Sequence, residues 1–183
     1  MAPLASVVYL AYLIDKGLIA LKVIKKEKYD ENELKAVFEF EKKEHQSIFI
    51  IKYIGYMTYG QYPLLMMEYA NLKTLDIIAK QSQIPMPSYT LRAIMKQIVQ
   101  GLNEFHLAEL IHRDIKCENI LLHCPRGSQR VYVKISDFGL AKKQDLDNQE
   151  KYQAGTLNYM APEIFQHSNT QPTQKVDMYA LKI

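Results

Sequence analysis

Residues 112–119 read His-Arg-Asp-Ile-Lys-Cys-Glu-Asn, and residues 137–139, which follow two short apolar runs, read Asp-Phe-Gly. A third motif, Ala-Pro-Glu, occupies residues 161–163. The first motif gathers carboxylate, amide and cationic side chains between a helical pattern and a predicted hairpin. It therefore lies on a connection between elements, where catalytic and binding residues are commonly found.

The first part of the chain consists of short apolar runs that predict strands. Residues 7–14 and 18–24 are two such runs, and the Asp-Lys-Gly between them is typical of a hairpin turn because glycine tolerates positive φ. Residues 30–44 mix charges around a narrow apolar face, which predicts a helix. Residues 48–59 and 63–69 predict two more strands. We therefore expect a small sheet with one helix.

The second part of the chain is predicted to be mainly helical. Ser88, which follows two prolines, is expected to cap a long helix. The apolar residues of this helix recur at spacings of three and four and are Leu91, Ile94, Met95, Ile98, Val99, Leu102 and Phe105. Residues 120–122 and 131–135 are apolar runs on either side of a loop with proline and glycine, which predicts a β-hairpin.

Composition limits the classes of protein to consider. The 183 residues, 48% of them hydrophobic and 23% charged, suffice for one domain with a real core. The 23 basic and 20 acidic residues intermingle to a net charge of +3, so nucleic acid and anionic membrane are not expected as partners. Two cysteines in a chain of this size favour a reducing compartment. No apolar run reaches the roughly 20 residues of a membrane span, so we expect a soluble, cytoplasmic protein.

The three motifs occur in the order and context in which the eukaryotic protein kinases carry them, and the sequence resembles that family from about residue 6 to residue 181. The resemblance implies a bilobal α+β protein-kinase-like fold. Its small, β-rich N-terminal lobe would occupy residues 1–70, and an incomplete, mainly helical C-terminal lobe would occupy residues 71–183. The implied function is transfer of the γ-phosphate of ATP, with Mg²⁺, to Ser or Thr hydroxyls of protein substrates.

Four residues of the first two motifs are the predicted catalytic set. Phosphoryl transfer depends on in-line positioning and on neutralising charge on the phosphate oxygens, so carboxylates, a cation and a metal suffice. Asp114 is the candidate to accept the substrate hydroxyl proton, and Lys116 can place its ammonium near the transferring phosphate. Asn119 and Asp137 are the candidate ligands of Mg²⁺, which prefers oxygen ligands. Two Mg²⁺ sites are implied.

The predicted nucleotide residues come mainly from the first lobe. Residues 19–22, Ile-Ala-Leu-Lys, are similar to the strand in which the family's lysine holds the α- and β-phosphates and pairs with a glutamate on the next helix. Lys22 is therefore the predicted nucleotide-binding lysine. Glu39, Glu41 and Glu44 are all within reach as its partner, and we select Glu41.

Residues 64–70 resemble the strand that leads into the family's hinge. By that resemblance Met67 is the gatekeeper, and Glu68 and Ala70 present backbone groups to adenine. The resemblance also implies that the adenine lies between the side chains of Val8, Ala20 and Leu121.

The segment after Asp-Phe-Gly resembles the activation segment of the serine/threonine branch. Thr156 is expected to hydrogen-bond Asp114 and Lys116, and Glu163 to pair with an arginine. In the family, an arginine at the position of Arg113 marks kinases whose loop is ordered by a phosphate. Between residues 140 and 155 only Tyr152 has a side-chain hydroxyl. We therefore expect either that acidic side chains at 145, 147 or 150 substitute for the phosphate or that Tyr152 is modified.

The sequence departs from the family at both ends. The glycine-rich loop should occupy residues 1–6, which contain no glycine, and Pro3 has no N–H to offer a phosphate. Near the other end, Asp177 resembles the aspartate that braces the catalytic loop from below, and the chain stops six residues later. We therefore expect an incomplete kinase domain. The alternative to an active kinase is a pseudokinase or inactive fragment that acts as a regulatory binding module.

Overall fold

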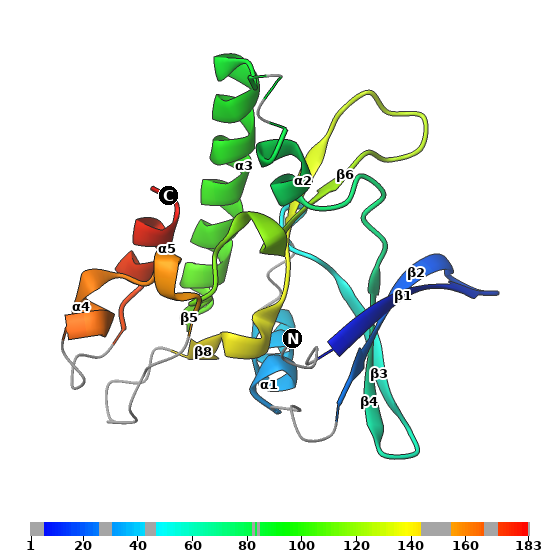
Figure 1. Cartoon of the computed structure of the whole chain (residues 1–183). Helices are drawn as coiled ribbons and strands as arrows, with labels where there is room; N and C mark the ends of the chain where they lie inside the picture. Colours follow the sequence, from blue (N-terminus) through cyan, green and yellow to red (C-terminus); the bar gives the residue numbers. More distant parts are fainter. Residues whose placement is uncertain are drawn as a thin grey trace.

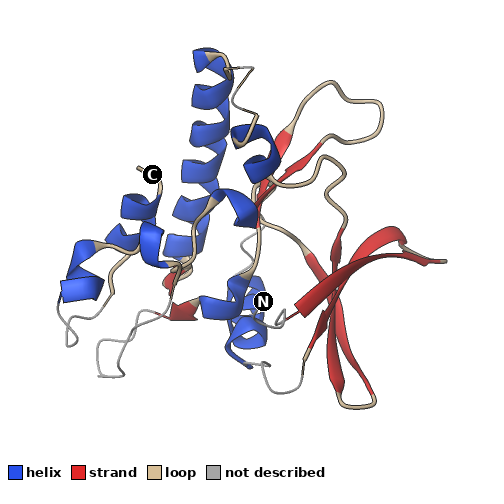
Figure 2. Ribbon diagram, viewed as in Figure 1, coloured by secondary structure: helices blue, strands red, loops and turns tan. Residues whose placement is uncertain are grey.

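The computed structural model describes residues 6–25, 31–42, 47–81, 83, 85–143, 155–166 and 172–182. In these ranges a four-stranded antiparallel sheet forms one lobe, while helices and two small two-stranded sheets form the other (Figure 1). Figure 2 shows the sheet on one side, the long helix on the other and a shorter helix between them. The predicted α+β class and two-lobed arrangement are confirmed.

The sheet has the strand order β1-β2-β4-β3, in which β1 is Ser6–Leu13, β2 is Gly17–Ile24, β3 is Tyr53–Tyr59 and β4 is Tyr62–Glu68. The predicted hairpin between β1 and β2 is present, and Gly17 has the positive φ of 74° that this turn uses. In the register of the sheet, Lys22 lies opposite Val8 on one side and Leu65 on the other. Because side chains alternate along a strand, these three residues share one face of the sheet.

The strand predicted over residues 48–59 is wrong in its first half, because β3 begins only at Tyr53. The backbone of the preceding residues pairs with the other lobe instead. Phe49 O accepts a hydrogen bond from Ile135 N at 2.8 Å, and Ile51 N donates to Ile135 O at 2.8 Å. The apolar run is therefore shared between two lobes, which the local pattern of residues could not reveal.

The helix between the two lobes is α1, Glu31–Lys42. It buries Ala36, Val37 and Phe40, and the Phe40 ring stacks on Phe105 of the second lobe with ring centroids 5.8 Å apart. This contact ties the helix to the part of the molecule that carries the first two motifs.

The second lobe contains α2 (Leu75–Ala79), α3 (Ser88–Leu107), α4 (Pro162–Gln166) and α5 (Lys175–Ala180). The predicted apolar stripe of α3 is buried at Ile94, Ile98, Leu102 and Phe105, whereas Leu91 and Val99 at its margin are exposed.

Ser88 does not cap α3. Pro87 holds the N-cap position, and its carbonyl accepts the first helical hydrogen bond, from Leu91 N at 3.0 Å. The Ser88 hydroxyl instead accepts a hydrogen bond from Arg92 Nη2. The helix therefore begins one residue earlier than predicted, since proline is well suited to an extended position just before a helical turn.

Two small two-stranded sheets complete the described part of the second lobe. Strand β6 (Ile120–His123) pairs with β7 (Tyr132–Ile135), as predicted, and β5 (Leu110–Ile111) pairs with β8 (Lys142–Lys143). Among the described residues, short 3₁₀ turns are formed by η2 (Cys117–Asn119), which directly precedes β6, by η3 (Phe138–Leu140), which lies between β7 and β8 in the chain, and by η4 (Leu157–Tyr159). The first motif ends where β6 begins, and the second motif begins two residues after β7 ends, so the open end of the β6–β7 hairpin brings the two motifs together.

The core beneath these motifs is aromatic. Phe138 of the second motif is buried and lies 5.4 Å from the Tyr53 ring and 5.1 Å from the Phe105 ring, centroid to centroid. Its ring also meets the buried His112 edge-on. Rings from both lobes therefore hold the second motif in place.

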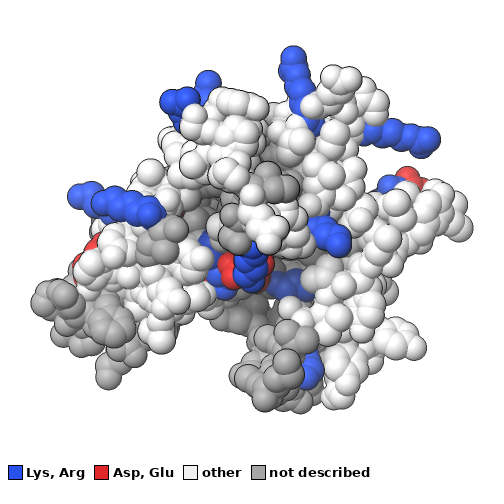
Figure 3. Space-filling model, turned by 45° about the horizontal axis from the view of Figure 1, so that its top comes forward, with Lys and Arg blue, Asp and Glu red and all other residues white. Residues whose placement is uncertain are grey.

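One face of the molecule shows how the charges of the described residues are distributed. On the face shown in Figure 3, the described Lys and Arg side chains project separately, and acidic groups lie beside basic ones near the central hollow. Among the residues that the structure describes, none of the helices combines the length and apolar character that crossing a bilayer requires.

Candidate active site

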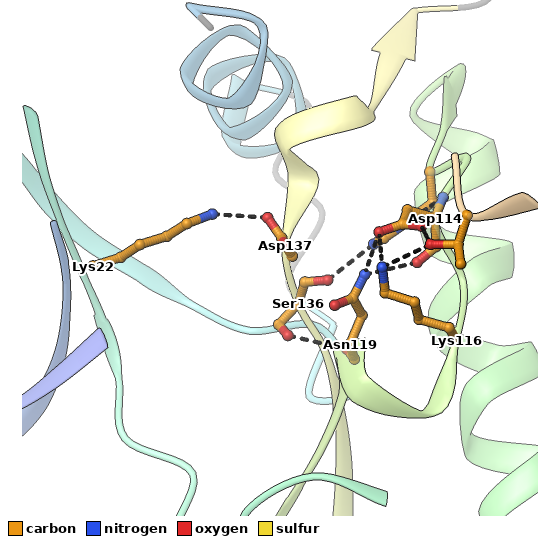
Figure 4. Close-up of polar contacts among 8 residues, drawn as sticks. Lys22, Asp114, Lys116, Asn119, Ser136 and Asp137 are labelled. Atoms are coloured by element: carbon orange, nitrogen blue, oxygen red, sulfur yellow. Dashed lines mark hydrogen bonds and ion pairs between the residues drawn. The ribbon is translucent and has the colours of Figure 1, made fainter. Parts of the chain in front are cut away.

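The candidate active site is built around the Asp114 carboxylate, which receives hydrogen bonds from three side chains (Figure 4). Lys116 Nζ lies 2.7 Å from Oδ2, Asn119 Nδ2 lies 2.9 Å from the same oxygen, and Thr156 Oγ1 donates to Oδ1 at 2.8 Å. Lys116 Nζ also reaches Thr156 Oγ1 at 2.9 Å. The hydrogen bonds expected of Thr156 are thus present, and they hold a nearly buried carboxylate in one orientation.

The Asn119 side chain is oriented by the same cluster. Its Nδ2 donates to the carbonyl oxygen of Asp114 at 2.8 Å as well as to the carboxylate of that residue. Because both amide hydrogens are used in this way, Oδ1 is the atom of this amide that can ligate a cation.

Asp137 faces the sheet lobe rather than the Asp114 cluster. Lys22 Nζ reaches across from β2 and lies 2.7 Å from Asp137 Oδ1 (Figure 4). Burial acts to raise the pKa of Asp137, but the charge and hydrogen bond of the Lys22 ammonium outweigh burial and hold this pKa below its usual value. Asp137 is therefore ionised at neutral pH and available to a cation.

Lys22 has one partner that the sequence did not indicate. Its pair with Asp137 was not anticipated, and the side chain of Glu41, the selected partner, lies outside the described residues, as does Glu44. The remaining candidate, Glu39, has its carboxylate 4.0 Å from Lys143 Nζ. The assignment of the helix glutamate stays a prediction.

The loop that carries Asp114 is supported from below by Asp177, as the resemblance implied. The fully buried Asp177 carboxylate accepts hydrogen bonds from the backbone N–H groups of His112 at 2.9 Å and Arg113 at 2.8 Å. It also lies 2.8 Å from His106 Nε2. Arg113, whose φ is +66°, in turn donates from Nε to the carbonyl of Leu140. A single carboxylate thus holds two consecutive peptide groups of the loop that carries Asp114.

His112 is held as a neutral ring. It is fully buried, and burial lowers its pKa although the carboxylates of Asp177, Asp137 and Asp114 act in the opposite direction. The Asp114 N–H points at Nδ1, so Nε2 carries the proton and donates to the carbonyl of Ser136 at 3.1 Å. This histidine is therefore a structural link between the two motifs and has no contact with solvent.

The residues predicted to surround adenine lie on suitable elements. Ala20 is paired with Leu10 and with the buried Met67, and the sheet register places Val8, Ala20 and Lys22 on one face. Val8 is exposed on that face. Leu121 is contributed by β6 of the other lobe.

The end of β4, the strand predicted to lead into the hinge, is held by ionic and backbone contacts that the sequence did not reveal. The Glu68 carboxylate accepts from Lys134 Nζ at 2.7 Å and from Lys52 N at 2.8 Å, while its own N–H donates to the Lys52 carbonyl. The N–H of Glu68 is therefore not the group that would face a base. Ala70 follows two residues later, outside any strand.

Some predicted residues cannot be placed. Tyr152 and residues 1–5, which include Pro3, lie outside the described residues. Glu163 lies in α4 and is half-buried.

Among the residues not anticipated, Ser136 stands out, because it contacts both motifs. Its only signal in the sequence was its position directly before Asp137.

The donor set is suited to a hard cation held together with phosphate. Within the described ranges, no three His, Cys, Asp or Glu side chains form a metal-binding cluster. The Asp137 carboxylate and the Asn119 amide oxygen instead offer a sparse set of oxygen ligands, which leaves positions for water and phosphate oxygens, as Mg²⁺ prefers.

A β-rich lobe with an inward-facing lysine, joined to a helical lobe with an acidic loop, is the arrangement of a phosphotransferase. The chain belongs to the protein kinase family, because residues 4–183 match the model of the protein kinase domain.

Several curated kinases are similar to this chain. Mitogen-activated protein kinase kinase kinase 15 of Mus musculus is 32% identical over 133 residues, which cover 72% of this chain and 10% of the relative. Receptor-interacting serine/threonine-protein kinase 1 of Homo sapiens is 30% identical over 149 residues, or 73% of this chain and 21% of the relative. A protein of Encephalitozoon cuniculi named "Probable serine/threonine-protein kinase KIN28 homolog" is 29% identical, covering 96% of this chain and 59% of the relative. The chain therefore spans between a tenth and three-fifths of the length of these relatives.

Proposed function

We propose that this chain is an ATP-dependent serine/threonine protein kinase domain that transfers the γ-phosphate of ATP to Ser or Thr hydroxyls of proteins. The observation that carries the proposal is the Asp114 cluster. Lys116, Asn119 and Thr156 all hold the Asp114 carboxylate, while Asp137 and Lys22 meet nearby at the face of the other lobe.

Each group has a defined task in this proposal. Asp114 accepts the proton of the attacking hydroxyl, because three side-chain hydrogen bonds hold its carboxylate in one orientation. Lys116, which already contacts Asp114, neutralises charge that develops on the transferred phosphate. Lys22 binds the α- and β-phosphates when a nucleotide separates it from Asp137. When bound, Mg²⁺ would neutralise phosphate charge at Asn119 and Asp137.

Specificity for Ser and Thr is supported by Thr156. Its hydroxyl bridges Asp114 and Lys116 and so occupies space beside the acceptor position. The printed names of two of the relatives include the words serine/threonine-protein kinase. Protein substrates and ATP are therefore the proposed partners, and the proposed location is the cytoplasm.

A binding module without catalysis is the second candidate. The observation in its favour is the absence of glycine from residues 1–6, where the family places the loop that approaches the phosphates.

Transfer of radiolabelled phosphate from ATP to a basic protein separates the two candidates. We expect labelling by the unaltered chain, its loss in Asp137→Ala, and unchanged labelling in the matched control Asp15→Ala, whose side chain lies in the exposed β1–β2 turn. Label that persists in Asp137→Ala, or no label from the unaltered chain, would exclude the kinase proposal.

A further inference from the structure

Ser136 occupies the position between the β6–β7 hairpin and Asp137. It is half-buried, and three of its polar groups are hydrogen-bonded to the catalytic loop (Figure 4). Ser136 N and Ser136 Oγ both donate to the Asn119 carbonyl, at 2.9 and 3.0 Å. The Ser136 carbonyl accepts from His112 Nε2 at 3.1 Å. One residue therefore contacts both ends of the first motif and is covalently joined to the second.

The Asn119 end of this connection is rigid. Asn119 is buried, its N–H donates to the Lys116 carbonyl at 3.0 Å, and its side-chain amide is held by Asp114. Because the carbonyl of Asn119 receives two hydrogen bonds from Ser136, movement of either residue is transmitted to the other.

The His112 end is equally well held. The His112 ring is fully buried, and its backbone N–H is bound by the buried Asp177 carboxylate. The peptide that follows Ser136 carries Asp137, whose φ of +68° is uncommon for a residue with a side chain. That conformation requires support from its neighbours, and the Ser136 contacts supply it.

The Ser136 hydroxyl matters because the backbone hydrogen-bond ladder between β6 and β7 ends before it reaches Asn119 and Asp137. The last paired residues of β6 and β7 are Ile120 and Ile135; Ile120 comes one residue after Asn119, and Ile135 comes two residues before Asp137. Strand ends are prone to open locally, and a side-chain hydrogen bond at that point adds to the single backbone bond.

We propose that Ser136 is a positioning residue for the metal site. Its hydroxyl holds Asn119 and Asp137 at a fixed separation, and so the apparent affinity for Mg²⁺ depends on it. This inference rests on the proposed function, since it assumes that these two residues hold Mg²⁺ with a nucleotide. The role differs from a general contribution to stability, because it predicts a change in metal dependence at constant fold.

The test is a titration with Mg²⁺ of the binding of a fluorescent, non-hydrolysable ATP analogue to the full chain. Loss of one hydrogen bond in Ser136→Ala is expected to raise the Mg²⁺ concentration at half-saturation by about two- to tenfold. Ser136→Thr retains the hydroxyl and is expected to stay within about twofold of the unaltered chain, and Ser136→Cys, a weaker donor, to fall between them. The matched control is Ser128→Ala at the other end of the same hairpin, whose hydroxyl accepts from Arg130 N. It is expected to leave the titration unchanged.

The outcomes are distinct. If Ser136→Ala fails to fold, the Thr and Cys variants still decide the question by the order of their Mg²⁺ midpoints. The role of Ser136 would be overturned by equal Mg²⁺ midpoints in all Ser136 variants, or by a shift of the midpoint in Ser128→Ala as large as that in Ser136→Ala. In either case, Mg²⁺-dependent binding by the unaltered chain would still support the proposed function. If the unaltered chain binds no analogue at any Mg²⁺ concentration, both the inference and its basis are refuted.

Discussion

Replacement of Asp177 by alanine tests the support of the catalytic loop. The carboxylate is fully buried and accepts hydrogen bonds from two consecutive backbone N–H groups, those of His112 and Arg113, and it also lies against His106. Asp177→Ala leaves both backbone donors without this acceptor. Since a buried unsatisfied donor costs about 1–3 kcal/mol, the two together predict a loss of about 2–6 kcal/mol in the free energy of unfolding. That is a large part of the roughly 5–15 kcal/mol that typically stabilises a domain.

The assay is urea unfolding of the full chain followed by circular dichroism, with the unaltered protein measured in parallel. Asp177→Asn keeps the shape and one acceptor oxygen, so its loss is expected to be smaller than that of Asp177→Ala. The exposed Asp15→Ala is the matched control and should unfold at the urea concentration of the unaltered chain. A loss below about 1 kcal/mol for Asp177→Ala, or one no greater than that of the control, would refute the role assigned to this carboxylate.

Two further predictions concern the same loop. Thr156→Val removes the hydroxyl that donates to Asp114 and accepts from Lys116. Because hydrogen bonds to charged groups contribute about 1.5–3 kcal/mol, this variant is expected to have a kcat about 10- to 100-fold lower. Thr156→Ser keeps the hydroxyl and should retain most of the activity. Equal kcat values for the Val and Ser variants would contradict it. Burial lowers the pKa of His112 in the folded chain. As the pH falls below about 6.5, the unfolded chain therefore binds a proton at this histidine before the folded chain does. The free energy of unfolding should then fall by about 1.4 kcal/mol per pH unit until the pKa of His112 in the folded chain is reached. Unfolding free energies of the unaltered chain should be level from pH 7.5 to about 6.5 and then fall with this slope down to pH 5.5, whereas His112→Phe should lack the slope below about pH 6.5. Identical slopes would show that the ring is not the group responsible.

The local sequence patterns were sufficient to predict the structure of segments whose conformation is decided by neighbouring residues in the chain. The Asp-Lys-Gly turn predicted the β1–β2 hairpin because the backbone there needs a positive φ that glycine adopts freely. The spacing of apolar residues predicted α3 because a helix buries one stripe of its surface. The order of the three short motifs indicated the family, to which the chain belongs.

The predictions failed where distant segments compete for the same backbone groups. Residues 49–51 look like the start of a strand, but their hydrogen bonds go to Ile135 in the other lobe. The pair of Lys22 with Asp137 was not predicted either, whereas the pairing of Lys22 with a helix glutamate stays a prediction. Neither partner could be identified from spacing along the chain, because both contacts form only when the lobes pack.

The amino-acid sequence by itself determined which chemical groups this protein carries and the short elements that present them, since turn propensity and periodicity act over a few residues. Only the tertiary structure decided how these groups meet. The Lys22 ammonium at the Asp137 carboxylate, the Lys134 ammonium at the Glu68 carboxylate and Ser136 between Asn119 and His112 all join residues that are not neighbours in the chain. Such contacts depend on burial and on which hydrogen-bond donors and acceptors are left unpaired once the core has formed. Both depend on residues that are distant in the chain.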